Sequence, residues 1–142
     1  YNAVTGANIT KEDIITQSER VYNFERIFNL RMGKGERIHH NAPNRGLGPV
    51  FADEWNARPD YFDGKLKEAG IAIDGLSVEE KIAKLQTFRR GQWEKLVDAV
   101  YARRGWNRNG IPTMETVKRL GIDTPEVVEL LKQHLKPEDD WK

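Results

Sequence analysis

Apolar residues recur along this chain at the spacing of an α-helix, and this periodicity limits the possible folds more than any other feature. The clearest run lies between residues 14 and 32, where successive apolar positions are seven, three, four and four residues apart. Charged side chains in this run fall mostly elsewhere, as on an amphipathic helix at a protein surface. The segment therefore predicts one long helix. Its apolar stripe consists of Ile14, Val21, Phe24, Phe28 and Met32, widened by Tyr22 and Ile27.

Residues that begin and end helices divide much of the remaining chain. Thr10 is a typical N-cap for the long helix, and Gly33 is a typical residue after its last turn. Ser77, Thr113 and Thr124 are N-cap residues for three further helices. No segment alternates between apolar and polar residues for long enough to predict a strand. The sequence therefore predicts an all-α, multihelical domain with a long irregular loop after the first long helix.

That loop covers residues 33–60. Four glycines and three prolines interrupt it, so we expect an extended segment with one helical turn near residues 53–55. A long irregular loop in a compact domain is usually functional or lies against another part of the protein. Phe51 and Trp55 would be costly to leave in water, which favours the second interpretation. As an alternative function, the chain would be a helical interaction module that binds a protein partner through this loop.

The length and charge of the chain limit the classes of protein to which it can belong. A chain of 142 residues is long enough for one domain with a core, here residues 1–142, and too short for two. The 23 basic and 22 acidic residues nearly cancel, which argues against nucleic-acid binding and against binding to acidic lipid. No apolar run is long enough to span a bilayer and no signal peptide is visible, so a cytoplasmic protein is expected. Because the first residue is Tyr1, we expect a fragment of a larger polypeptide.

Few side chains could bind a metal or carry catalysis. The chain has no cysteine, so it supplies no thiolate ligand and no cysteine nucleophile. His39 and His40 are adjacent in the loop, and His134 is near the C-terminus, where we expect it to face solvent. None has the spacing of a metal site, so a solvated or packed histidine pair is favoured over one that lines a site. His39 and His40 are the candidates for a catalytic role, and no residue is assigned to a metal or a cofactor.

Two segments carry more information than their helical pattern. The first reads "SERVYNFERIFNLRMG" at residues 18–33, and the second reads "YARRGWNRNGIPTMETVKRLGI" at residues 101–122. The first resembles the pattern G-E-R-I-Y-N-L-E-R-L-F-N-x-R-x-G of the tungsten-containing aldehyde ferredoxin oxidoreductase family. The second is similar to the closing signature of that family, a tyrosine, then R-G-W, G-x-P-T and a short helix ending L-G. With the opening "YNAVTGANIT", the similar segments cover about a third of the chain in the order of the family.

The resemblance implies the C-terminal, all-helical part of such an enzyme, inactive on its own. Members hold a tungsten (in some cases molybdenum) bis-pterin cofactor beside a 4Fe–4S cluster, and they oxidise aldehydes to carboxylic acids with ferredoxin as electron acceptor. The cluster cysteines and main pterin-binding motifs of the family lie upstream of the similar segments, so no ligand is carried over. The implied partners are the remaining domains of the parent enzyme and ferredoxin or a related electron-transfer subunit, and a homo-oligomer is compatible with the resemblance.

The loop after the first segment departs from the family pattern. Members read approximately R-K-D-D-T-L-P-E-R-F there, whereas this chain has "KGERIHHNAPNRGLG" and keeps only Pro43 and Arg45. His39 and His40 are candidates to line the site of the parent enzyme because they lie in this replaced motif. A substrate other than a simple aldehyde, such as an aromatic acyl thioester, is compatible with the departure.

The second segment has an unusual composition around Trp106. Gly105 and Gly110 allow the backbone to turn sharply on either side of it, and Pro112 sets the direction into the next helix. Tryptophan in such a connector is expected to pack inward. The sequence therefore predicts that Trp106 anchors the turn.

Overall fold

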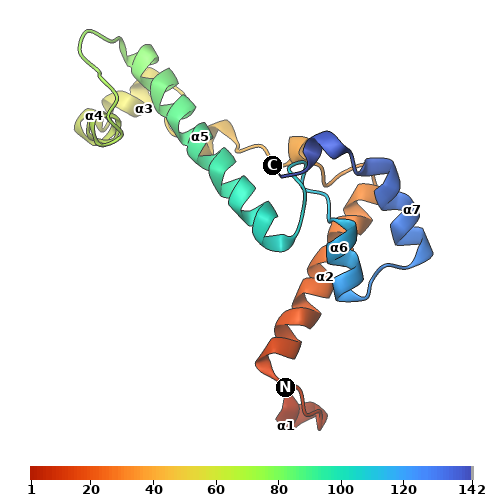
Figure 1. Ribbon diagram of the computed structural model, residues 1–142. Helices are drawn as coiled ribbons and strands as arrows, with labels where there is room; N and C mark the ends of the chain where they lie inside the picture. Colours follow the sequence, from red (N-terminus) through yellow and green to blue (C-terminus); the bar gives the residue numbers. More distant parts are fainter. Residues whose placement is uncertain (142) are drawn as a thin grey trace. The chain divides into compact units, whose positions relative to one another are not determined.

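The computed structural model describes residues 1–141, and its regular structure is helical (Figure 1). These residues form seven α-helices, three short 3-10 helices and no β-strand beyond an isolated bridge between Trp106 and Pro112, which confirms the all-α fold class. No helix in this part of the chain is both long enough and apolar enough to cross a membrane. The α-helices are α1 (Asn2–Thr5), α2 (Lys11–Arg31), α3 (Ala52–Asn56), α4 (Pro59–Glu68), α5 (Val78–Arg104), α6 (Met114–Leu120) and α7 (Pro125–His134). The 3-10 helices are η1 (Arg37–His39), η2 (Asn44–Leu47) and η3 (Pro137–Asp139).

Helix α2 begins and ends where its capping residues predict. The Asp13 amide donates to Thr10 Oγ1 at 3.1 Å, and the Thr10 amide donates to Asp13 Oδ2 at 2.8 Å. The hydrogen bonds from Thr10 lower the pKa of Asp13 because they favour its charged form. At the other end, Gly33 takes the left-handed conformation with φ 71°, which ends the helix without strain.

The N-caps of the later helices also lie at their predicted positions. At the start of α5, the Ser77 amide donates to Glu80 Oε2 at 2.7 Å and the Glu80 amide donates to Ser77 Oγ at 3.2 Å. Thr113 Oγ1 caps α6 by accepting from the Thr116 amide at 3.2 Å. Thr124 occupies the N-cap position of α7, although its side chain accepts no capping hydrogen bond.

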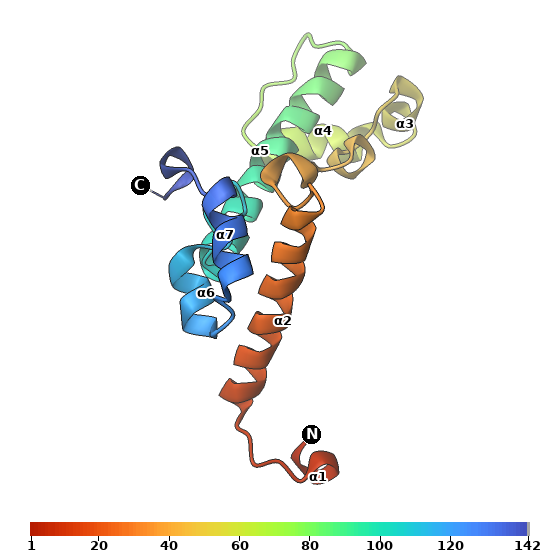
Figure 2. The same cartoon turned by 90° about the vertical axis from the view of Figure 1, so that its right-hand side faces the viewer.

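The chain divides into two compact units. The first contains residues 1–40 and the residues from 99 onward. Within it, α6 and α7 lie beside α2, as the two views agree (Figures 1 and 2). The expectation of one domain over residues 1–142 stays a prediction. The buried apolar core of the first unit consists of Ile27, Leu30, Ile111, Val117, Val127 and Leu131.

The second unit, residues 41–98, holds most of the segment expected to be irregular. Two side chains of α5 bind backbone carbonyls of this segment, Gln86 Nε2 to Pro49 O at 2.8 Å and Arg89 Nη1 to Leu47 O at 3.3 Å. Trp55 is buried at 1% exposure, as predicted, but Phe51 is 64% exposed, so its predicted burial is wrong. Phe51 is the N-cap residue of the short helix α3, and only the Trp55 indole, four residues after the cap, reaches the core. That core consists of Trp55, Leu66, Ile73, Ile82 and Leu85.

Ile27, predicted to widen the apolar stripe of α2, is instead buried in the core. The stripe itself is exposed, although such a stripe normally faces the core of its own domain. Its five side chains are between 43% and 64% exposed. At about 100° per residue, the stripe and the buried residues lie on opposite sides of the helix. The packed side contains two polar residues because the rest of the unit offers them partners. The buried residues of α2 are Asn23, Arg26, Ile27 and Leu30.

Candidate functional site

The second family-like segment forms a tight turn between α5 and α6. The Trp106 amide donates to Tyr101 O at 2.9 Å, and the Thr113 amide donates to Gly105 O at 3.1 Å, which closes the turn on itself. The Trp106 side chain is 4% exposed, so the predicted anchor is confirmed. Its indole Nε1 donates to Asn23 Oδ1 of α2 at 2.7 Å, so its polar edge is satisfied in the interior.

The two glycines of the turn are required by backbone angle and by space. Gly105 has φ 68° and Gly110 has φ 79°, a region that strongly favours glycine. A Cβ added to Gly110 would lie 2.7 Å from the Tyr101 ring and would collide with the Arg26 guanidinium. A Cβ at Gly105 would collide with the hydroxyl of Thr116, which donates to Gly105 O at 2.7 Å. The turn can therefore approach its neighbours only because these positions have no side chain.

Arg26 of α2 reaches this turn from the other family-like segment. It is 6% exposed, and its Nε donates to Gly110 O at 2.7 Å. Its guanidinium carbon lies 4.5 Å from the centroid of the Trp106 ring and 5.6 Å from that of Tyr101, both within cation–π range. The two segments that resemble the family thus meet at one buried arginine.

Arg26 has no carboxylate partner among residues 1–141. Its hydrogen bonds go to a backbone carbonyl and to the His40 ring. Burial lowers the pKa of Arg26, and the neighbouring Tyr101 and Tyr22 partly oppose this shift. An arginine remains charged at neutral pH because its ordinary pKa lies far above neutrality. Aromatic faces and neutral acceptors therefore compensate this buried cation in place of an ion pair.

His40 lies between Arg26 and Tyr101. Its Nε2 is 2.6 Å from Arg26 Nη1, and its Nδ1 is hydrogen-bonded to the Tyr101 hydroxyl. Arg26 Nη2 also lies 3.3 Å from Nδ1. Because a guanidinium can only donate and its contact with Nε2 is the shorter of the two, we assign Nε2 as the unprotonated acceptor and place the single ring proton on Nδ1. Burial lowers the pKa of His40, and the adjacent Arg26 and His39 lower it further. His40 is therefore a neutral ring with both nitrogens engaged.

The other two histidines lie outside this cluster. His39 is exposed at the end of η1, and the structure does not bring it together with His40 into one pair. His134 does not face solvent as expected, because its ring is half-buried and its Nδ1 lies 3.0 Å from Glu36 Oε1. Glu36 immediately precedes η1, so this contact links α7 to the segment that follows α2. No group of three or more His, Cys, Asp or Glu side chains able to hold a metal ion occurs among the described residues.

An arginine and a tyrosine extend the cluster toward the surface. The Tyr22 ring stacks on Trp106 with centroids 6.1 Å apart, and the Arg104 guanidinium carbon lies 3.6 Å from the Tyr22 centroid. A continuous stack therefore runs from Arg104 through the Tyr22 and Trp106 rings to Arg26. Such stacking is favourable without an ion pair and holds α2 against the end of α5.

This arrangement is suited to positioning the turn, because its hydrogen-bonding atoms are used by other groups of the same unit. Arg26 and Tyr101 were missed as functional residues by the sequence reasoning. The available signal was their place in the two family-like segments, where both match letters of the pattern. Helical periodicity alone could not identify them, since a charged residue on a helix is normally expected in water.

Comparison with known proteins identifies the family to which the chain belongs. A family model described as aldehyde ferredoxin oxidoreductase, domains 2 and 3, matches residues 1–122. No curated protein and no solved structure matches the chain. The matched range includes α2, the Trp106 turn and α6, whereas α7 and the tail lie beyond it. Because the match covers most of the chain, this protein belongs to the aldehyde ferredoxin oxidoreductase family, in the region of its domains 2 and 3.

Proposed function

We propose that this chain is the C-terminal helical part of a tungstopterin and iron–sulfur oxidoreductase that oxidises aldehydes to carboxylic acids and passes the electrons to ferredoxin. The observation that carries the proposal is the family match over residues 1–122. The meeting of both family-like segments at Arg26 supports it, because the matched residues then share one structural task. The chain would help to enclose the active site and would be inactive alone.

The cofactors of such an enzyme would be bound by other parts of the parent polypeptide. The chain has no cysteine to ligate a 4Fe–4S cluster, and residues 1–141 contain no group of three or more His, Cys, Asp or Glu side chains able to hold a metal ion. We therefore assign no ligand of the bis-pterin or of the cluster to this chain and derive no catalytic step through them. Its contribution is a rigid scaffold in which α2, the Trp106 turn and α6 keep their places through the Arg26 cluster.

The same proposal implies the partners and the location of the parent enzyme. It would work with its remaining domains, with ferredoxin or a related electron-transfer subunit, and as a homo-oligomer or a single copy. It would act in the cytoplasm. The near balance of 23 basic and 22 acidic residues gives no support to a nucleic-acid partner.

Of the two adjacent histidines, His39 is the one we propose to line the substrate channel of the parent enzyme. Its ring is exposed, whereas both nitrogens of His40 are engaged by Arg26 and Tyr101. We expect His39→Ala in the parent enzyme to change turnover or KM, with the neighbouring exposed Ile38→Ala as matched control. The Ile38→Ala enzyme should keep the original turnover and KM. Equal turnover and KM in the two variants would show that His39 does not line the channel.

A helical interaction module without catalytic activity is the alternative function. The exposure of Ile38 (70%) and Phe51 (64%) within residues 33–60 favours it, since exposed apolar residues often mark a protein contact. In this alternative, the protein that contains the chain would bind no tungsten, molybdenum or iron.

Metal analysis of the purified parent polypeptide decides between the two functions. We expect inductively coupled plasma mass spectrometry to find tungsten or molybdenum together with iron in the parent, and neither in the 142-residue chain. Aldehyde-dependent reduction of ferredoxin should accompany the metals. A folded, metal-free parent from a host that makes the cofactors would overturn the enzymatic proposal and favour the interaction module.

A further inference from the structure

The exposed stripe of α2 is the largest unexplained feature of the first unit. From Ile14 to Met32 it extends about 27 Å along the helix, at about 1.5 Å per residue. Phe24, Phe28 and Met32 are 57%, 56% and 64% exposed, although such side chains are usually buried. Exposed apolar side chains gathered on one face of a helix commonly mark a protein or membrane contact.

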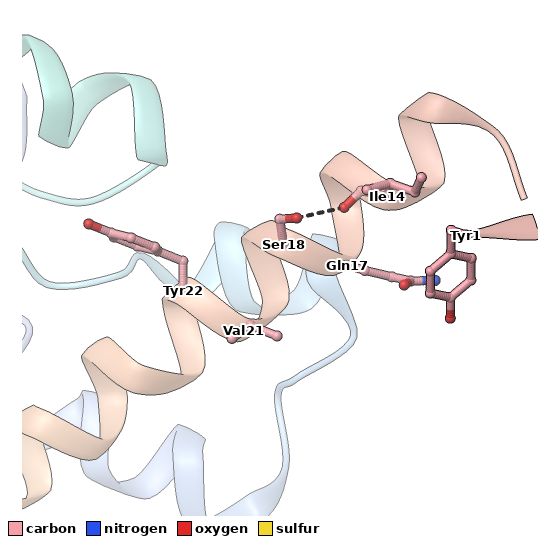
Figure 3. Close-up of a pocket in the computed structure, with 6 residues that line it drawn as sticks. All are labelled: Tyr1, Ile14, Gln17, Ser18, Val21 and Tyr22. Atoms are coloured by element: carbon pink, nitrogen blue, oxygen red, sulfur yellow. Dashed lines mark hydrogen bonds between the residues drawn. The ribbon is translucent and has the colours of Figure 1, made fainter. Parts of the chain in front are cut away.

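A shallow groove continues the stripe toward the N-terminus (Figure 3). It has a volume of about 370 Å³. Ser18 contributes little polarity to it, because its hydroxyl donates to Ile14 O at 2.8 Å within the helix. The groove therefore widens the stripe at its N-terminal end without adding charge. Its lining residues are Tyr1, Ile14, Gln17, Ser18, Val21 and Tyr22.

The charges on α2 favour a protein over a membrane as the occupant. A helix that lies on an anionic membrane is typically rich in Lys and Arg on its polar face. Helix α2 has four basic residues and four acidic residues, so it has no excess of positive charge, and the face opposite the stripe packs within the unit. Asn23 and Arg26 on that face are buried and bind the Trp106 turn instead.

We propose that this stripe is the surface through which the chain packs against the rest of its parent oxidoreductase, and this inference rests on the proposed function. Val21, Phe24 and Phe28 lie within residues 1–122, the range that the family model matches. The matched family model describes domains 2 and 3 of an enzyme, which implies a parent enzyme with at least one further domain to cover the stripe.

The partner surface is accordingly apolar and low in charge. An acidic or basic patch would find no counterpart at the five stripe positions. In the assembled enzyme, α2 would then be covered on both sides, by α6 and α7 on one side and by the partner surface on the other. The helix would become a central element of the enzyme, although it is peripheral in this unit.

Hydroxyl-radical footprinting of the intact parent enzyme, read by mass spectrometry, tests the coverage. Trp106, 4% exposed, is the internal standard for a buried side chain, and the denatured enzyme is the standard for full exposure. We expect oxidation of Phe24, Phe28 and Met32 to fall at least fivefold below the denatured level and to approach that of Trp106. Oxidation at about half the denatured level would match the exposure seen here and would overturn the proposal, even in an enzyme that holds its metals and oxidises aldehydes.

Site-specific photo-cross-linking identifies the occupant. We would replace Phe28 by p-benzoylphenylalanine in the parent enzyme, with the same replacement of Asn29, an exposed polar neighbour off the stripe, as matched control. We expect Phe28→p-benzoylphenylalanine to give an adduct within one polypeptide, joined to a segment outside residues 1–142, and the control to give none. An adduct between two copies that disappears on dilution would assign the stripe to self-association. That outcome, or equal labelling at both positions, would overturn the inference.

Discussion

The two long faces of α2 differ in solvent exposure, and the more apolar face is the more exposed one. The face packed within the first unit includes Asn23 and Arg26, which are 2% and 6% exposed. The opposite face has only apolar residues at its five stripe positions, and these are 43% to 64% exposed. In this helix, burial follows the availability of partners in the same unit and not the polarity of the residue.

The physical reason lies in the cost and compensation of burial. A buried polar group without a partner costs about 1–3 kcal/mol, but Arg26 and Asn23 bind Gly110 O and Trp106 Nε1. The stripe gains about 25 cal/mol per Å² only when another surface covers it. This chain therefore supplies the partners of the packed face of α2, whereas the stripe needs a second surface to cover it. The following predictions test this difference, beginning with the largest expected effect.

Trp106→Ala should cause the largest loss of stability, about 3–5 kcal/mol, because it removes the indole that Arg26 and Asn23 pack around. Phe28→Ala on the opposite face is the matched aromatic control and should cost less than about 1 kcal/mol. Urea denaturation followed by circular dichroism measures both. Similar losses in the two variants would contradict the distinction between the faces.

Gly110→Ala should cost about 3 kcal/mol, since it combines an unfavourable φ of 79° with a collision against Arg26 and Tyr101. Gly121→Ala has a similar φ of 64°, but its Cβ would meet nothing within 4 Å. It should therefore cost only about 1–2 kcal/mol, the conformational part alone. Equal midpoints of thermal unfolding would show that the space around Gly110 is not limiting.

Arg26→Met should cost about 2–3 kcal/mol, because it leaves Gly110 O without a donor and removes the cation from the Trp106 ring. Arg26→Lys should restore little of this loss, since an ammonium cannot reproduce the planar guanidinium between rings and carbonyl. Arg31→Met, at an exposed position of the same helix, is the control and should change stability by less than about 0.5 kcal/mol. Full rescue by lysine would show that charge alone matters at position 26.

Much of the fold could be predicted from the sequence, because local signals set it. Thr10, Ser77 and Thr113 begin helices at the expected places, and Trp106 is buried between the two glycines that flank it. The side of α2 that packs inward could not be predicted, because a periodic stripe indicates an apolar face without indicating which molecule covers it. The roles of Arg26 and His40 could not be predicted either, since they depend on contacts between residues 14 or more positions apart.

Acid should weaken the cluster through His40. The pKa of His40 in the folded chain lies below its ordinary value of 6.5, so the unfolded chain binds the proton more readily. This contribution to stability is complete above about pH 6.5 and is lost as the pH falls below it toward the folded pKa. His40→Gln keeps an acceptor for Arg26 but does not titrate, so denaturation between pH 7.5 and 5 should show a shallower decline than in the original chain. His39→Gln, which removes an exposed ring, is the matched control, and an equal effect of both variants would contradict the assignment to His40.

Phe24→Gln should have the smallest effect on the chain itself, a change of less than about 0.5 kcal/mol, because the ring is 57% exposed and glutamine is at least as good a helix former. Leu30→Gln, 1% exposed on the packed face, is the matched comparison and should cost about 3 kcal/mol by placing a polar group in the core. Urea denaturation measures both losses of unfolding free energy. Their ratio compares the contribution of the exposed face of α2 to the stability of the unit with that of the packed face. A loss above about 2 kcal/mol for Phe24→Gln would mean that the chain covers its own stripe in solution, and the stripe would then be part of a core that needs no second surface. A negligible loss here, combined with protection of Phe24 in the parent enzyme, would mean that the apolar residues of this face are retained for a contact that the 142-residue chain cannot make alone.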